Sequence, residues 1–78
     1  MTLGMDVKVD AAGEVKITVF NLLGQRVKRI VDQNMPAGLS RAYWDGTNDA
    51  GSLVASGLYF VVIQAPDDQM VRKVIVIR

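Results

Sequence analysis

Short segments in which apolar and polar side chains alternate are the feature that most limits the possible folds of this chain. Val or Ile stands at positions 7, 9, 15, 17 and 19, and most residues between them are charged or polar. A period of two is typical of strands that bury one face, whereas an amphipathic helix requires a period near 3.6. Four residues, 11–14, join the two segments and include a glycine. We therefore expect an antiparallel hairpin over residues 5–20.

A turn and an irregular strand follow this hairpin. Asn21 and Gly24 bracket the predicted turn, and the two leucines between them are expected to pack over an edge of the core. The apolar residues of 25–31 fit neither strict alternation nor a helical period. This segment is therefore predicted to be a strand with a bulge.

The middle of the chain contains two predicted loops around one short strand. Residues 32–38 contain Pro36 and Gly38 and are predicted to form the first loop. In the strand 39–44, alternation places Trp44 on the same face as Ser40 and Ala42, so Trp44 is the expected core anchor. Asp, Asn, Thr and Gly dominate residues 45–51, which predicts a dense turn region.

The last third of the chain predicts two paired strands. In the predicted strand 58–64, residues 58–63 are apolar on both faces, as expected of a central strand, and a turn at 66–68 leads to a final strand at 69–77. With about six or seven short antiparallel strands and no helical period, the sequence predicts an all-β fold, a small immunoglobulin-like Greek-key sandwich. We expect residues 1–78 to form a single domain. An SH3-like or OB barrel is the alternative fold.

Composition excludes several classes of function. The 78 residues include no Cys and no His, which removes disulfides, thiolate metal sites and the commonest general base. Nine basic and eight acidic residues give a net charge of +1, too balanced for nucleic-acid binding through phosphates. The longest apolar run, 58–63, is too short to insert into a membrane. We assign no catalytic residue and no cofactor.

Three groups of side chains are candidates for binding, each with a structural alternative. Asp45, Asn48 and Asp49 carry the oxygen ligands that Ca²⁺ accepts, but Asp and Asn also cap turns, which is the favoured interpretation. Tyr43 and Trp44, with Tyr59 and Phe60, are candidates for stacking on a sugar, but alternation sends Tyr43 and Trp44 to opposite faces. Basic residues are typical of solvated faces and of edge strands that resist aggregation; here they are Arg26, Lys28, Arg29, Arg72, Lys73 and Arg78.

The order of several short motifs is recognisable. They are Val-Lys-Ile-Thr-Val-Phe-Asn-Leu-Leu-Gly-Gln-Arg-Val at 15–27, Pro-Ala-Gly at 36–38, Trp-Asp-Gly at 44–46, Asp-Ala-Gly at 49–51, Ser-Gly-Leu-Tyr-Phe at 56–60 and Arg-Lys-Val-Ile-Val-Ile-Arg at 72–78. This order resembles the C-terminal sorting domains of proteins exported by the type IX secretion system. It is equally similar to the FlgD-like immunoglobulin-like domain, named for the flagellar hook-capping protein.

The resemblance implies mainly structural roles for the motif residues. Glycines would supply turn backbone, Trp44 the buried aromatic ring, and Gly57 a close approach to the neighbouring strand. The structural motif residues are Gly24, Trp44, Asp45, Gly46, Gly51, Gly57 and Tyr59.

The resemblance also implies a function. It suggests a non-catalytic accessory domain of a secreted or cell-surface bacterial protein, acting as a sorting or anchoring signal for the secretion machinery. The candidate recognition residues are Lys73, Val74, Ile75, Val76, Ile77 and Arg78. One alternative is a structural spacer or assembly module, which would contact neighbouring domains or associate with itself through strand edges. Another is a carbohydrate-binding module attached to a glycosidase. An Asn-Pro-Phe-like segment that often opens the sorting domains is missing before Met5.

Overall fold

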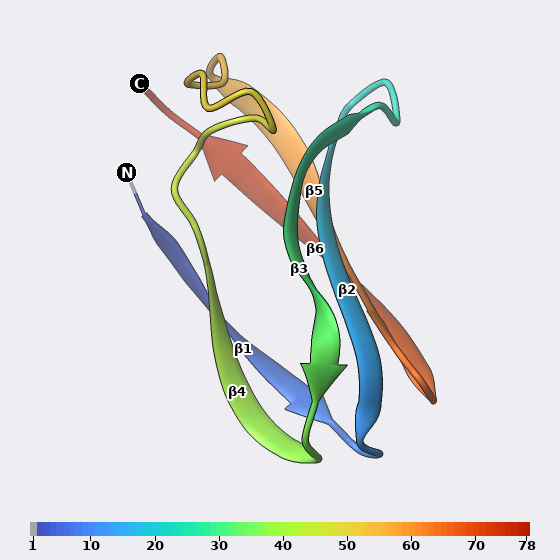
Figure 1. Ribbon diagram of the computed structural model, residues 1–78. Helices are drawn as coiled ribbons and strands as arrows, with labels where there is room; N and C mark the ends of the chain where they lie inside the picture. Colours follow the sequence, from blue (N-terminus) through green and yellow to red (C-terminus); the bar gives the residue numbers. More distant parts are fainter. Residues whose placement is uncertain (1) are drawn as a thin grey trace.

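A computed structural model describes residues 2–78 as six strands in two facing sheets (Figure 1). The strands are β1 (Leu3–Val9), β2 (Gly13–Asn21), β3 (Arg26–Met35), β4 (Gly38–Trp44), β5 (Gly57–Ala65) and β6 (Asp68–Val76). One sheet has the order β1-β4 and the other β3-β2-β5-β6, and all pairings are antiparallel. The predicted all-β immunoglobulin-like sandwich is thereby confirmed. No helix in the described part of the chain is long and apolar enough to span a membrane.

The core lies between the two sheets and is built from the alternating residues. Burying one Val or Ile side chain contributes about 1.5–3 kcal/mol, so each strand with one apolar face stabilises the sandwich. Trp44 is 1% exposed, as expected of the core anchor. The buried apolar residues are Met5, Val7, Val9, Val15, Ile17, Val19, Ala42, Trp44, Val54, Tyr59, Val61, Ile63 and Val76.

The predicted hairpin over residues 5–20 is wrong. β1 pairs with β4, from Leu3 opposite Trp44 to Val9 opposite Gly38, whereas β2 pairs with β3 and β5. The short connector after β1 carries the chain from one sheet to the other instead of reversing it within a sheet. Alternation identifies the buried face of each strand, but two strands that face each other across a core show the same pattern as two neighbours.

β3 extends further than expected and contains the predicted irregularity. The loop predicted at 32–38 is wrong over its first residues, because β3 continues to Met35 and pairs with β2 there. Its exposed end is polar because β3 is an edge strand with little to bury. The register with β2 shifts twice, leaving Val27 and Ile30 without a direct partner, so the predicted bulge is confirmed.

The remaining turns and pairings follow the expectations in part. Gly24 donates its N–H to the carbonyl of Asn21 at 3.0 Å, which closes the predicted turn. Leu22 and Leu23, however, are 68% and 82% exposed and do not pack on the core. The Asn21 side chain accepts N–H bonds from Leu23 and Gln25, so this tip is held by its own hydrogen bonds and needs no apolar contact. β5 is central and pairs with β6, as predicted.

Candidate functional site

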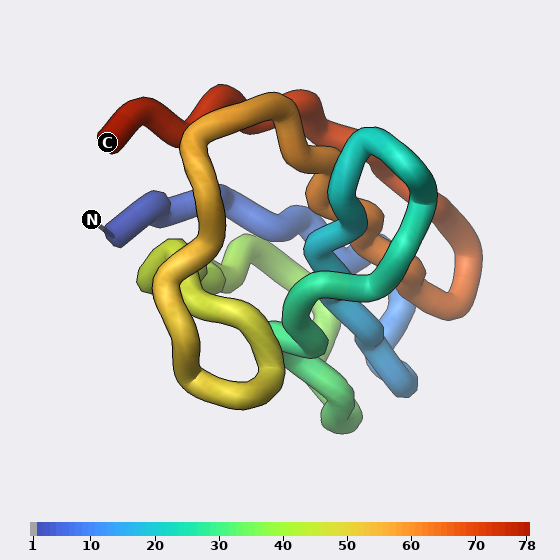
Figure 2. The backbone as a smooth tube through the Cα atoms, turned by 90° about the horizontal axis from the view of Figure 1, so that it is seen from above, coloured from blue at the N-terminus to red at the C-terminus, as the bar shows by residue number. Residues whose placement is uncertain are grey.

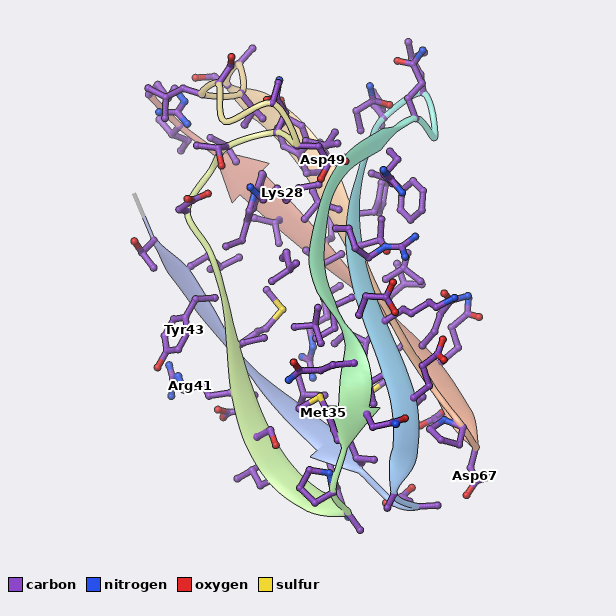
Figure 3. The ribbon with its side chains drawn as sticks, viewed as in Figure 1. Lys28, Met35, Arg41, Tyr43, Asp49 and Asp67 are labelled. Atoms are coloured by element: carbon purple, nitrogen blue, oxygen red, sulfur yellow. The ribbon has the colours of Figure 1, made fainter. Side chains whose placement is uncertain are left out.

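The loop between β4 and β5 covers the free edge of β3. The Asp49 N–H donates to the carbonyl of Val27 at 2.9 Å, and the Asp49 Oδ1 accepts the Arg29 N–H at 3.0 Å. The Arg26 Nε donates to the other carboxylate oxygen at 3.1 Å. Asp49 therefore takes the place of a neighbouring strand residue where the bulged edge of β3 would otherwise expose unpaired backbone groups (Figure 3).

The carboxylates of this loop are stabilised in their ionised form. Hydrogen bonds from the Thr47 hydroxyl and backbone N–H lower the pKa of Asp45 below its usual value. The Arg29 N–H, followed by the nearby Arg26 and Lys28 charges, lowers the pKa of Asp49. Both side chains are therefore ionised acceptors at neutral pH and poor candidates for a general acid.

The oxygen-rich loop proposed as a Ca²⁺ candidate uses its oxygens on its own backbone. The Asn48 Oδ1 accepts N–H bonds from Ala50 and Ser52, both at 3.0 Å. The Asp45 and Asp49 carboxylates likewise accept bonds from loop and strand donors. Residues 2–78 contain no group of three or more His, Cys, Asp or Glu arranged to hold a metal. Turn capping accounts for the contacts of Asp45 and Asn48, whereas the Asp49 carboxylate caps the edge of β3.

Trp44 and Tyr59 connect this loop to the core. Their rings meet edge to face with centroids 5.5 Å apart. The Trp44 Nε1 donates to the Thr47 carbonyl at 2.9 Å, and the Tyr59 hydroxyl donates to the Ala55 carbonyl at 2.7 Å. The two aromatic residues thus bind both ends of the loop between β4 and β5.

Some glycines of the motif are required by their backbone conformation, whereas a lack of space for a side chain is a separate requirement. Gly24, Gly46 and Gly51 have φ angles of 80°, 79° and 85°, in the left-handed region that other residues enter at a cost. The expectation of a close approach at Gly57 is wrong, because a Cβ built there meets no heavy atom within 4 Å. Gly13 is instead the crowded position, where a Cβ would lie 2.5 Å from Pro66 Cγ.

The candidate recognition residues of the last strand do not form one surface. Val74 and Val76 face the sandwich interior, and Val76 is 1% exposed, whereas Lys73 and Ile75 lie on the outer face. Arg78, beyond β6, donates from its guanidinium to the carbonyls of Val54 and Gly46, which fastens the chain end to the loop between β4 and β5. Ile77 is 83% exposed. The tail is therefore part of the folded structure.

The outer face of the four-stranded sheet carries an apolar stripe that faces solvent. Strand pairing places Phe20 opposite Phe60, Val62 opposite Val71, and Leu58 opposite Ile75. Val71 and Ile75 are 58% and 68% exposed, although an outer sheet face is ordinarily polar. We call these six residues the outer stripe. The sequence shows that residues 58–63 are apolar on both faces, but only the sheet order shows that one of these faces stays uncovered.

The exposed aromatic ring on the other sheet stands alone. Tyr43 is 57% exposed and lies beside the Arg41 guanidinium (Figure 3), whose carbon is 5.9 Å from the ring centroid. Trp44, in contrast, is buried in the core. The two residues cannot stack together on a sugar, as alternation predicted.

Comparison with known proteins identifies the family. Residues 2–69 match the FlgD Ig-like domain family, which is well over half of the chain. The chain belongs to the FlgD Ig-like domain family. The crystal structure of FLGD from P. aeruginosa superimposes with a TM-score of 0.75 at 21% identity, over 96% of this chain and 59% of that chain. The likeness at this identity shows the shared fold. No curated protein matches.

The family match bears on the two resemblances differently. It supports the FlgD-like resemblance and gives no support to the resemblance to type IX sorting domains. The match ends at residue 69, before the candidate recognition residues 73–78. This chain also spans only 59% of the P. aeruginosa FLGD chain.

Proposed function

We propose that this FlgD-like domain is a non-catalytic structural module that helps to assemble a larger bacterial protein. The outer stripe is the observation that carries the proposal, because an uncovered apolar sheet face is typical of a protein interaction surface. Membership of the FlgD Ig-like family supports a structural module. The occupant we assign to the outer stripe is a neighbouring domain of the parent protein.

The positions of the chain ends support attachment from one side. β1 begins and β6 ends at the same end of the sandwich, and the first and last segments lie on the same side in the view from above (Figures 1 and 2). A linear spacer enters and leaves at opposite ends. A parent chain that continued from both ends would leave the sandwich at one end, so the sheet faces would stay free to contact a neighbouring domain.

The export-signal function is a second candidate, and two exposed apolar side chains among the predicted recognition residues favour it. Ile75 and Ile77 are 68% and 83% exposed. A truncation of residues 73–78 would not test this function cleanly, because it would remove the buried Val76 and the contacts of Arg78 with the loop. Replacing Ile75 and Ile77, which are both exposed, with Ser in a reporter fusion should keep the fold, and loss of reporter export in that folded variant would support a sorting role.

Site-specific photo-crosslinking in the parent protein tests the assembly function. A benzophenone amino acid replaces Ile75 on the outer stripe or, as a control, Leu39 on the other sheet; these residues are 68% and 73% exposed. We expect crosslinks from position 75 to a neighbouring domain and none from position 39. Equal crosslinking at both positions, or none at position 75, would contradict the proposed docking face.

A further inference from the structure

The sandwich is open along one side, between β1 and β6. In the described residues β1 pairs only with β4 and β6 only with β5, so one backbone edge of each strand has no partner strand. Residues 3–6 of β1, residues 72–74 of β6 and Val61 line a groove of about 370 Å³ between these edges. The opposite side is different, because the short link from β3 to β4 joins the sheets there (Figure 1).

The groove has an apolar floor and a cationic rim. Met5 and Val61 on its floor are 7% and 0% exposed, and Leu3 and Val74 pack against the core. Arg72 stands opposite the buried Val61 in the β5–β6 register and so lies on the inner face of an edge strand. A charge in that position ordinarily opposes pairing with a further strand.

The cations of the rim have no partner in the described residues. No carboxylate of residues 2–78 lies within 4.0 Å of the Arg72 or Lys73 nitrogen atoms. The one acidic residue in the groove, Asp6, is paired with Arg41 on β4 at 3.5 Å. The rim therefore carries two uncompensated positive charges beside a free backbone edge.

These charges discriminate between possible occupants. A second copy paired antiparallel through β6, with its two-fold axis near Arg72 and Lys73, would set cations against cations, which is destabilising. A purely apolar strand would bury Arg72 without a counter-charge, which is costly. An acidic strand would form hydrogen bonds with the free backbone groups of β6, and its carboxylates would neutralise the charges of Arg72 and Lys73.

We propose that an extended acidic segment of a partner protein binds the groove as an added strand along β6. Residues opposite each other in an antiparallel pair share a face, so a carboxylate opposite Arg72 meets its guanidinium on the inner side. Apolar residues opposite Met70 and Val74 enter the groove, and a second carboxylate meets Lys73 on the outer side. The recognised pattern is apolar, acidic, acidic, polar, apolar, held by backbone bonds and read by alternate side chains.

Peptide titration of the ¹⁵N-labelled chain tests the proposal. The probe is the capped peptide Thr-Val-Glu-Glu-Thr-Val-Thr, and Thr-Val-Lys-Lys-Thr-Val-Thr is its matched control. We expect amide shifts in residues 70–74 and 3–6 with the acidic peptide, and affinity for the lysine peptide weaker by about tenfold or more. Equal affinity for the two peptides, no binding of either, or shifts confined to the outer stripe would overturn the proposal.

Charge reversal separates recognition by Arg72 from general attraction to a basic surface. Arg72→Glu should invert the preference between the two peptides. Lys8→Glu, at an exposed cation outside the groove that pairs with no carboxylate of residues 2–78, should leave it unchanged. If the Arg72→Glu variant lacks the buried-tryptophan emission of the folded chain, Arg72→Gln replaces it and should lose the preference. An unchanged preference in a folded Arg72 variant would refute the assignment.

The groove and the outer stripe share no residue. Replacing Ile75 with Ser alters the outer stripe without touching a residue of the groove. If the Ile75→Ser variant still binds the acidic peptide, the groove proposal is supported even if no neighbouring domain contacts the outer stripe. Concentration-dependent dimerisation of the free chain that Arg72→Glu strengthens would identify a second copy as the occupant and overturn the acidic-segment proposal.

Discussion

Replacing Trp44 with alanine should remove a large share of the stability of this domain. The side chain is 1% exposed, packs edge to face against Tyr59 and donates a hydrogen bond to the Thr47 carbonyl. Truncating a buried Trp costs about 3–5 kcal/mol, because the removed contacts and the remaining cavity both count. At roughly 0.05–0.15 kcal/mol per residue, a 78-residue domain has about 4–12 kcal/mol in total.

Trp44→Phe is the matched control, because it keeps an aromatic ring beside Tyr59 and loses the indole N–H. The lost hydrogen bond to Thr47 alone predicts a cost of about 0.5–1.5 kcal/mol, with a further cost for the smaller ring. Urea unfolding followed by circular dichroism measures both variants. An alanine variant that loses less than about 1 kcal/mol, at an unchanged dependence on urea, would refute the assignment of Trp44 as the core anchor.

Two further predictions concern a crowded glycine and the acid stability of the β3 edge. Gly13→Ala should cost about 1–3 kcal/mol through overpacking, because the new methyl would lie 2.5 Å from Pro66. Gly57→Ala has the same φ of 159° but open space around it, so thermal melts of the two variants isolate the contact with Pro66; equal losses would exclude that cause. The folded-state pKa of Asp49 lies below its unfolded value near 3.8, so its contribution to stability is present above that pH and is lost as pH falls through the lower value. Asp49→Asn should therefore lower the melting temperature at neutral pH. The difference in melting temperature between the variant and the unmodified chain should become smaller below about pH 4. A difference that does not change with pH would contradict the role of the ionised carboxylate.

The candidate interaction surfaces were only partly predictable. The sequence showed that residues 58–63 are apolar on both faces, which is half of the signal for the outer stripe. The other half lies in the register, which places Val71 and Ile75 beside Val62 and Leu58 on a face that no other sheet covers. The groove at Arg72 could not be predicted, because alternation alone does not reveal that β1 and β6 are the facing edges of different sheets.

Local chemistry determined the strands, the turns and the buried faces. Alternation of two requires strands with one buried side, and Trp44 lies on the buried side of its strand by parity alone. The turn-forming residues at 21–24 and 45–51 act through bonds to their own backbone, so their effect is readable from short stretches.

Tertiary structure decided which strands pair, which faces remain open and where each strand ends. β1 and β2 carry the same pattern as a hairpin, yet they lie in different sheets. Alternation determines which face of a strand is buried, but it does not determine which strand is its hydrogen-bonded neighbour. The polar end of β3 joins the sheet because β2 supplies hydrogen-bond partners, which no local pattern records. Strand pairing depends on residues that are distant in the sequence, so it is determined by the packing of the whole core.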